Sequence, residues 1–253
     1  MNLTTISDSC RFLLNNFPEA QECCDYLNNR FFSKESQDLF QFGYFPSIKD
    51  ISVLISLIGE KLLCDNKILY TKEINDALGP RIIQFSYFEN YPLIIPFRNL
   101  QGEIIALVGR TLLSDYERKK INISKYKNTI FKKSNHLFGL FENKQYILDL
   151  ESVFVVEGQF DVIKAMQIGI RNIVALGCSN MSSYQLSILT RYTNNINLLL
   201  DNDEGGEKGR KVIINKFGKF ANINNLYISN NYKDIDEYIS KENICRYEDI
   251  FFI

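Results

Sequence analysis

The sequence predicts an α/β fold for its C-terminal part and an α+β protein overall, and three observations lead to this prediction. From residue 151 onwards, short apolar runs alternate with single amphipathic stretches. This alternation is typical of a mostly parallel sheet with helices on both faces. Residues 1 to about 65 have apolar residues at helical spacing. Residues 81–113 carry short apolar runs broken by Asn, Pro and Gly, as strands and turns do.

Three of the expected N-terminal helices have recognisable features. Residues 18–31 open on Pro18, a residue that suits the first turn of a helix. Residues 33–46 begin at Ser33, a typical helix cap. Residues 47–63 are the third helical stretch.

The middle of the chain combines strands with a basic segment. Residues 93–110 read as a strand, a turn and a second strand. Residues 117–133 hold seven Lys or Arg and one Glu, although the net charge of the whole chain is only −1. Such a segment attracts nucleic-acid phosphates without regard to sequence, but a solvated surface loop has the same composition.

Strands and helices alternate through the C-terminal part. The strands are expected in SVFVVEG, RNIVALG, NINLLLD and NNLYIS, and the helices in QFDVIKAMQIG, SSYQLSILTRY and EKGRKVIINKFGKF. We therefore expect a mixed helical and β basic subdomain at 1–150, a parallel-sheet domain at 151–231 and a short C-terminal tail at 232–253.

Composition excludes several classes of protein. No apolar run is long enough to span a membrane, and the N-terminus lacks the features of an export signal, so we expect a cytoplasmic protein without a membrane partner. The six cysteines form no C-x-x-C pair and His136 is the only histidine. A zinc site is therefore not expected, and we interpret the cysteines as reduced and structural.

Acidic residues follow three of the predicted strands. In such folds ligands bind beyond the carboxyl ends of the strands. Asp161 lies four residues after Glu157, so both acids share one face if a helix starts at once. The carboxylates that could converge on one edge of the sheet are Glu157, Asp161, Asp201, Asp203, Asp234 and Asp236.

A cluster of carboxylates stays ionised only with a counter-charge. Oxygen ligands without His or Cys favour a hard cation, Mg²⁺ or Mn²⁺, and such ions typically act on phosphates. Gly205 and Gly206 would let the backbone pass close to a bulky polyanion. Each acidic motif alone is equally compatible with an exposed turn or a solvated helix start, but their order on alternating strands and helices favours a shared site.

These motifs resemble the Toprim module of bacterial DnaG-type DNA primases. The resemblance rests on VVEGQFD with Glu157 and Asp161, on DNDEGG with Asp201 and Asp203, and on KDIDE from Lys233. Toprim modules also occur in topoisomerases, nucleases and recombination proteins. The upstream segments YPLIIPFRNLQGEIIALVGR, SKYKNT and IFKKSNHLFGL are similar to primase segments, so the resemblance extends from about residue 20 to 240.

The resemblance implies roles for individual residues. It implies that Glu157, Asp201 and Asp203 are catalytic and that all six acids hold the metals used for phosphodiester formation. It also implies a basic region that contacts template or nucleotide phosphates. The residues of that region are Arg98, Arg110, Lys125, Lys127, Asn128, Lys132 and Lys133.

Some primase features have no counterpart in the sequence. We find no stretch that resembles the zinc-binding or helicase-binding domains, and GCSN at 177–180 replaces a threonine-bearing turn. We therefore expect a replicative helicase or a separate zinc-module protein as a partner, and a phage or other mobile element as the source.

The leading hypothesis is a primase catalytic core that makes RNA primers from ribonucleoside triphosphates on single-stranded DNA. A Toprim metal-dependent nuclease would use the same acids. A non-catalytic single-strand-binding subunit of a replication complex would not need them.

Overall fold

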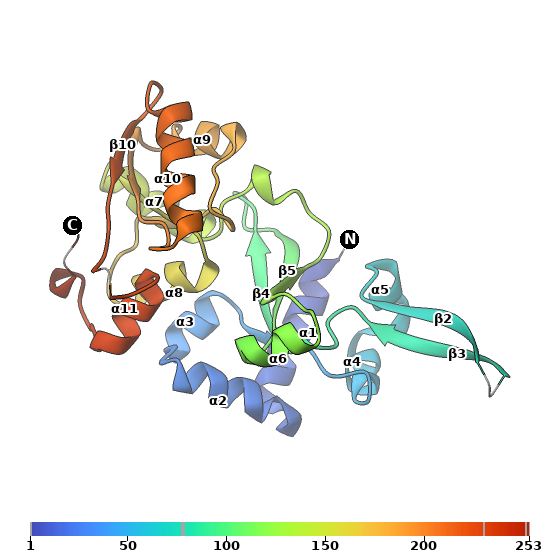
Figure 1. Cartoon of the computed structure of the whole chain (residues 1–253). Helices are drawn as coiled ribbons and strands as arrows, with labels where there is room; N and C mark the ends of the chain where they lie inside the picture. Colours follow the sequence, from blue (N-terminus) through green and yellow to red (C-terminus); the bar gives the residue numbers. More distant parts are fainter. Residues whose placement is uncertain (1, 77–78, 230, 251, 253) are drawn as a thin grey trace. The chain divides into compact units, whose positions relative to one another are not determined.

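The predicted parallel sheet is present in the computed structural model, which describes residues 2–76, 79–229, 231–250 and 252. Its strands are β7 (Val153–Val156), β8 (Ile173–Ala175), β9 (Asn195–Leu198) and β10 (Asn222–Asn225). They lie in the order β10-β9-β7-β8, and every neighbouring pair is parallel. The α/β prediction is therefore confirmed (Figure 1).

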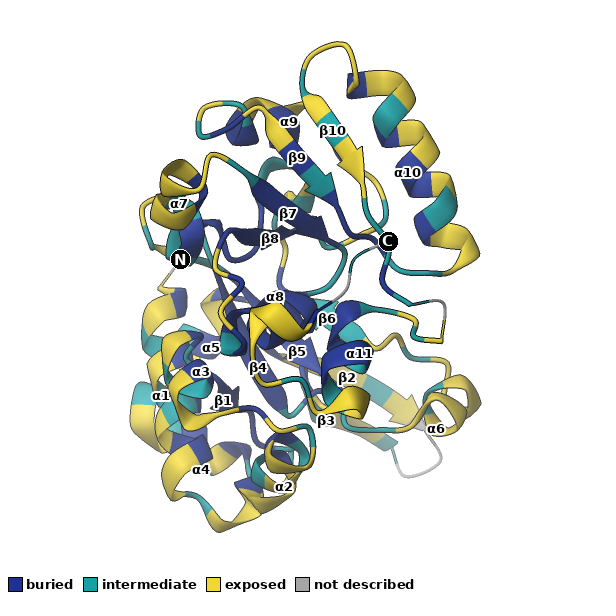
Figure 2. Cartoon of the chain, turned by 90° about the vertical axis from the view of Figure 1, so that its left-hand side faces the viewer, coloured by how far each residue is buried: buried dark blue, intermediate teal, exposed yellow. Residues whose placement is uncertain are grey.

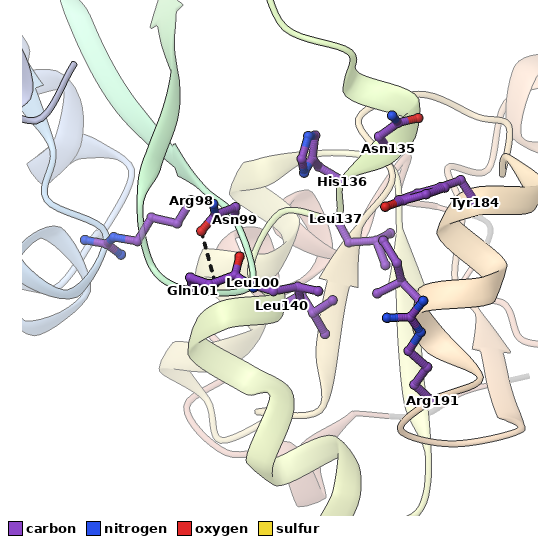
Figure 3. A pocket seen from close by; sticks show the side chains of 11 residues that line it. Arg98, Asn99, Leu100, Gln101, Asn135, His136, Leu137, Leu140, Tyr184 and Arg191 are labelled. Carbon is purple, nitrogen blue, oxygen red and sulfur yellow. Dashed lines mark hydrogen bonds between the residues drawn. The ribbon is translucent and has the colours of Figure 1, made fainter. Parts of the chain in front are cut away.

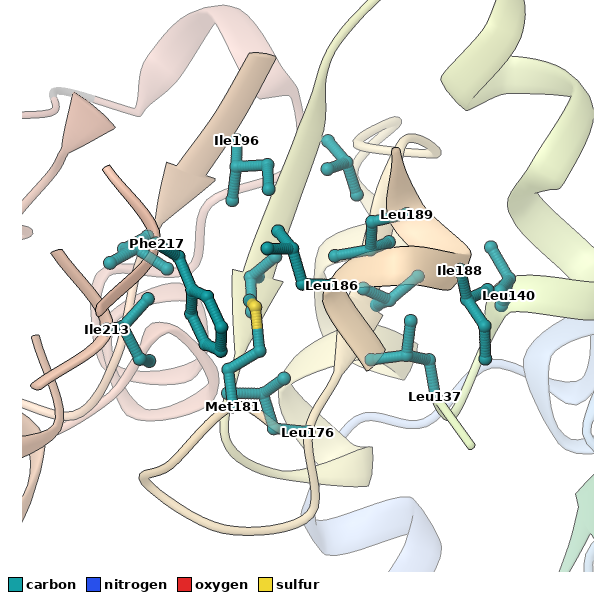
Figure 4. Close-up of a cluster of buried hydrophobic side chains, with 14 of the residues drawn as sticks. Leu137, Leu140, Leu176, Met181, Leu186, Ile188, Leu189, Ile196, Ile213 and Phe217 are labelled. Atoms are coloured by element: carbon teal, nitrogen blue, oxygen red, sulfur yellow. The ribbon is translucent and has the colours of Figure 1, made fainter. Parts of the chain in front are cut away.

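Helices cover both faces of this sheet. They are α7 (Leu140–Asp149), α8 (Gln159–Gln167), α9 (Ser183–Leu189), α10 (Glu204–Phe217) and α11 (Ile235–Glu242), together with short 3-10 turns at Lys133–Asn135 and Tyr247–Asp249. Val153 and Val155 alternate onto one face, where they pack in one core cluster with Leu189 of α9 and Phe217 of α10 (Figure 4). Helix α8 packs against β8 and α11 on the other face.

Burial differs from the centre of the sheet to its edge. Strands β7 and β8 are buried throughout, whereas β10 is mostly exposed (Figure 2). On the exposed side of β9 and β10, the amide of Asn222 donates to Asn195 and that of Asn224 donates to Asn197. This pairing explains why β10 occupies 222–225 rather than the predicted 224–229.

The chain divides into two compact units. The first comprises Met1–Phe97 and Glu103–Phe131, and the second comprises Arg98–Gly102 and Lys132–Ile253. The second unit takes in residues 132–150, which the sequence-based division assigns to the N-terminal subdomain, because α7 contributes Leu140 and Ile147 to the core of the parallel sheet. Residues 251 and 253 of the predicted tail lie outside the described residues.

The first unit contains the predicted N-terminal helices and an antiparallel sheet. The sheet order is β1-β4-β5-β6, and β2 and β3 form a separate two-stranded ribbon. Its elements are α1 (Leu3–Asn16), a 3-10 turn at Pro18–Ala20, α2 (Gln21–Asn29), α3 (Lys34–Leu39), β1 (Gly43–Tyr44), α4 (Ile51–Ile58), α5 (Glu60–Asp65), β2 (Leu69–Asp76), β3 (Gly79–Ser86), β4 (Leu93–Arg98), β5 (Ile104–Arg110), α6 (Asp115–Lys120) and β6 (Tyr126–Asn128).

Two features of this unit differ from the sequence prediction. The single helix expected at 47–63 is two helices, because Gly59 adopts a positive φ of 78° between α4 and α5. The ribbon at 69–86 was not predicted. Its strands have few buried residues, so the apolar alternation that marks a strand is weak there.

Within the described ranges, no helix is both long and apolar enough to cross a membrane.

The core of the second unit gives a direct test of the packing. Ile213 is fully buried on α10, whereas its neighbour Val212 is 46% exposed. We expect Ile213→Ala to lower the free energy of unfolding by about 2–5 kcal/mol, since it removes buried methyl groups and leaves a cavity. Val212→Ala is the control and should change it by less than about 0.5 kcal/mol. Urea titrations followed by circular dichroism would show this, and equal effects of both substitutions would contradict the packing.

Candidate functional site

Two of the predicted acids meet at the ends of adjacent strands. Strands β7 and β9 pair in parallel, with Val155 opposite Leu198. The residues just beyond their carboxyl ends are therefore neighbours, and the backbone N–H of Asp201 donates to Oε1 of Glu157 over 3.3 Å. The sheet thus brings together Glu157 and Asp201, as the sequence predicted.

A second contact joins α8 to the last acidic motif. Asp161 accepts a hydrogen bond from the N–H of Gly158 at 3.0 Å and another from the N–H of Asp236 at 3.4 Å. Both Asp161 and Asp236 are buried. Helix α11 therefore lies where its own acids add to those of the strand ends.

Asp203 and Asp234 begin helices. Asp203 caps α10 by accepting from the N–H of Gly206 at 3.0 Å, and Asp234 caps α11 by accepting from the N–H of Glu237 at 2.8 Å. Aspartate is a favoured residue at this position because its oxygen satisfies a backbone N–H that the helix leaves unpaired.

Lys233 supplies the positive charge within this group of acids. Its Nζ lies 2.9 Å from Asp201 Oδ2 and 3.5 Å from Asp203 Oδ2. Its carbonyl accepts from the N–H of Asn202 at 2.6 Å, which ties the segment before α11 to the end of β9. Lys233 is the first residue of the KDIDE motif, and the sequence pattern predicted no role for it. The feature that could have indicated a role is its position directly before the acidic pair Asp234 and Asp236.

The pKa values of the acids follow from this arrangement. Burial, with the charge of Asp201, raises the pKa of Glu157 to about 7. Burial raises the pKa of Asp161 well above its ordinary value, and Asp234 and Asp236 add to the effect. Burial also raises the pKa of Asp201, although Lys233 opposes it.

Asp203 and Lys233 shift in the direction that favours their charged forms. The hydrogen bond from Gly206 lowers the pKa of Asp203. Burial alone would lower the pKa of Lys233, but the hydrogen bond and charge of Asp201 outweigh it and raise that pKa. The charged forms of these two side chains are therefore stabilised by groups already present in the chain.

The donor chemistry of the cluster fits a hard divalent cation. Its ligands are carboxylate oxygens, and the raised pKa values of Glu157 and Asp201 indicate a site short of positive charge. Among the described residues, no group of three or more such side chains is arranged to hold an ion. Lys233 provides part of the missing charge.

A buried arginine fixes the strand ends that carry the acids. The Arg210 guanidinium donates to the carbonyl oxygens of Leu200 at 2.5 Å, Leu226 at 2.9 Å and Leu198 at 3.3 Å. The carbonyl of Leu198 lies at the end of β9, and that of Leu200 lies just after it, immediately before Asp201. The carbonyl of Leu226 lies just after the end of β10. Sequence reasoning did not find this residue, since an arginine inside an amphipathic helix is usually a surface residue.

Four of the predicted basic-region residues lie on the β5–β6 ladder of the first unit, but not on one face. Arg110 is buried, and its Nη2 donates to the hydroxyl of Tyr26 at 2.7 Å. Asn128 lies on the same face as Arg110, because Arg110 pairs with Tyr126 across the ladder.

Lys127 points to the opposite face and lies 4.2 Å from the centre of the Tyr87 ring. Lys125 is exposed beside Tyr126.

The other three basic residues belong to the second unit. Arg98 forms an ion pair with Glu142, with Nη1 and Oε1 2.5 Å apart. Lys133 donates to the carbonyl of Gly177 at 3.2 Å, and Lys132 is exposed. The structure therefore assigns intramolecular contacts to Arg98, Arg110, Lys127 and Lys133. Lys125, which lies near the Tyr126 ring, and Lys132 are exposed.

Comparison with known families defines the class of protein. Residues 154–239, which carry all six acids, match the family described as Toprim-like. Residues 12–144, more than half of the chain, match the DNA primase catalytic core, N-terminal domain. The chain therefore belongs to the DNA primase catalytic-core family.

Individual relatives agree with this assignment. The chain is 28% identical to the DNA primase of Aquifex aeolicus over 92% of its own length, and 30% identical to that of Synechococcus elongatus over 92%. It spans only 45% and 34% of the lengths of these two proteins.

Solved structures show the same fold. A DNA primase domain from Pseudomonas aeruginosa is 26% identical with a TM-score of 0.75, covering 95% of this chain and 74% of that one. The Aquifex aeolicus primase structure, at 24% identity, also has a TM-score of 0.75 and covers 99% of this chain and 60% of that one.

Gly206 is the last residue of the DNDEGG motif, which begins at Asp201. A Cβ built there would lie 2.0 Å from the carbonyl oxygen of Asp201, whereas one at Gly205 would meet only the Asp203 side chain, at 3.1 Å. We expect Gly206→Ala to destabilise the protein by about 1–3 kcal/mol because backbone atoms must shift. Gly205→Ala should stay within about 1 kcal/mol, since alanine favours the helix and the exposed Asp203 carboxylate needs only a slight shift that keeps its cap on α10. Chemical denaturation would distinguish these values, and equal losses would contradict the close approach.

Lys233 should compete with divalent cations for the acids. We expect Lys233→Met to lower the melting temperature in EDTA, because Asp201 loses its counter-charge. Added Mg²⁺ should then raise the melting temperature of this variant by more than that of the unmodified chain. Lys241→Met is the control, since Lys241 is exposed and pairs with Glu237 on α11. An identical response to Mg²⁺ in all three proteins would argue against competition.

Proposed function

We propose that this chain is the catalytic core of a DNA primase, which joins ribonucleoside triphosphates into short RNA primers on a single-stranded DNA template. The observation that carries the proposal is that the primase N-terminal family and a Toprim-like segment occur in order in one chain. The similarity to DNA primases over 92% of the chain supports it. A structure described as the DnaG primase catalytic domain bound to single-stranded DNA has the same fold, at 23% identity and a TM-score of 0.74.

In this proposal Glu157, Asp201 and Asp203 are catalytic, and together with Asp161, Asp234 and Asp236 they would hold Mg²⁺ or Mn²⁺. The cation would neutralise phosphate charge and activate the attacking hydroxyl. The chain itself would position these acids. The hydrogen bond from the N–H of Asp201 to Glu157 sets the spacing of the two strand ends, and Arg210 fixes the backbone just before Asp201.

The basic residues would bind nucleic-acid or nucleotide phosphates. Lys125 and Lys132 have exposed side chains suited to phosphate contact. Arg98, Arg110, Lys127 and Lys133 already have intramolecular partners, so in this proposal they position the segments that carry Lys125, Asn128 and Lys132.

Partners and source extend the proposal. A replicative helicase or a separate zinc-module protein would supply helicase coupling and template choice. A cytoplasmic location and a phage source also stay predictions.

The acids can be tested by primer synthesis. With single-stranded DNA, labelled ribonucleotides and Mg²⁺ or Mn²⁺, we expect template-dependent oligoribonucleotides from the unmodified chain. Asp201→Ala should reduce the rate about a hundredfold or more, since a catalytic metal contributes several kcal/mol to the barrier. Glu204→Ala is the control, because Glu204 is exposed and pairs with Lys208.

Other outcomes would support the alternatives. Degradation of the DNA that needs Asp201 would indicate the Toprim nuclease. DNA binding that survives Asp201→Ala, without synthesis or degradation even when a helicase and a zinc-module protein are added, would indicate a single-strand-binding subunit.

A further inference from the structure

The second unit contains a pocket of about 290 Å³ that none of the acidic residues lines (Figure 3). Three segments enclose it: the turn at 99–101, the segment 135–137 and one side of α9. Its floor is apolar, since Leu137, Leu140 and Ile188 line it and are buried. Among the described residues, none of the proposed metal ligands lines it, and Arg98 is the one residue of the basic region that does.

Helix α9 and the turn after it present a distinctive face to this pocket. Tyr184 and Ile188 are four residues apart, so they lie on one side of α9, and Arg191 lines the pocket from the turn that follows the helix. Figure 3 shows Tyr184 and Arg191 reaching from this side with Leu137 between them. Tyr184 is 54% exposed although it is a large aromatic residue.

Two polar groups of the pocket are available to a ligand. Among the described residues, the Tyr184 hydroxyl and the Arg191 guanidinium have no hydrogen-bond or ion-pair partner. A second Tyr–Arg pair in the same unit behaves differently: Arg171 donates to the hydroxyl of Tyr146 at 3.1 Å and lies over its ring.

The walls of the pocket are fixed by interactions behind them. The Arg98–Glu142 ion pair is only 11% and 5% exposed at its two side chains and anchors the start of the turn. Lys144 donates to the carbonyl of Leu100 at 3.1 Å. The amide of Gln185 donates to the carbonyl of His136 at 2.8 Å. A ligand would therefore enter a pocket that is already formed, which limits the entropy lost on binding.

The lining identifies the chemistry of the ligand. No carboxylate lines the pocket among the described residues, and Glu142 already balances the charge of Arg98. An exposed aromatic ring stacks on nucleobases, a guanidinium binds phosphate, and the amides of Gln101 and Asn135 suit the polar edge of a base.

We propose that this pocket binds one nucleotide, with its base against Tyr184 and its phosphate at Arg191. The same chemistry is offered by a free nucleotide and by one nucleotide of a DNA strand. The proposal goes beyond primer synthesis and does not require the acids to be catalytic.

The phosphate contact is tested with adenosine and AMP in EDTA, which removes any cation from the acidic cluster. Isothermal titration should show that AMP binds the unmodified chain about tenfold more tightly than adenosine does, the value of a charge-assisted hydrogen bond. In Arg191→Ala this difference should disappear while adenosine binding is unchanged. An equal preference for AMP in both proteins would overturn the phosphate assignment.

The base contact and the source of the nucleotide are tested with Tyr184→Ala. We expect this substitution to weaken nucleotide binding by about tenfold. The same measurement with a short single-stranded oligodeoxyadenylate separates the sources. If Tyr184→Ala lowers the affinity for AMP, the pocket is a site for free nucleotides. If it lowers the affinity for the oligonucleotide alone, the pocket is a site for one residue of a strand.

Tyr146→Ala and Arg171→Ala are the matched controls, since they remove the same residue types from a pair outside the pocket. Neither should change any affinity. The pocket proposal fails if neither AMP nor the oligonucleotide binds in EDTA, or if the control substitutions weaken binding as much as those in the pocket. Thermal unfolding of each variant would confirm that these exposed substitutions leave the fold intact.

Discussion

The crowding of carboxylates at one edge of the parallel sheet is the constraint on which the rest of the second unit depends. The pairing of β7 with β9 forces Glu157 and Asp201 together, and burial makes their charges unfavourable. The fold deals with the six acids in two ways. Asp203 and Asp234 are satisfied as helix caps. The other four are buried or half-buried, and burial raises the pKa values of Glu157, Asp161 and Asp201 although each has a hydrogen-bond or ion-pair partner.

Two cations flank this edge and have different roles. Lys233 is partly exposed on a loop and contacts the carboxylates directly, so it can withdraw when another cation arrives. Arg210 is buried and donates to backbone carbonyls instead. Burial lowers the pKa of its guanidinium, and Tyr227, Glu207, Glu157 and Asp201 oppose this shift in that order. One cation thus adjusts the charge of the site, while the other holds the strand that carries it.

The sequence predicted the features that depend on local patterns. Strands β7, β8 and β9 are short apolar runs between helix signals, and α9 begins within the predicted helical stretch SSYQLSILTRY, where Ser182 caps it. The approach of Glu157 to Asp201 was predictable because parallel strands end at a common edge.

The features that the sequence did not predict depend on contacts between distant residues. The position of β10 is set by amide pairs with β9 rather than by apolar alternation. Arg210 lacks any local signal, since its partners are carbonyls of other segments. The ion pair of Arg98 with Glu142 likewise joins residues 44 positions apart.

The isolated ribbon of β2 and β3 has a consequence for local opening of the chain. It is a two-stranded structure, which is marginally stable by itself. The side-chain amide of Gln84 donates a hydrogen bond to Glu60 of α5, and the N–H of Tyr87 donates to the carbonyl of Ile68 where the ribbon begins. The ribbon nevertheless has little buried surface, since Ile82 is 71% exposed. The ribbon can therefore open while the four-stranded sheet stays folded, and its amides would exchange with solvent far faster than those of β4 and β5. A protease would then find its first cleavage sites there, well before global unfolding.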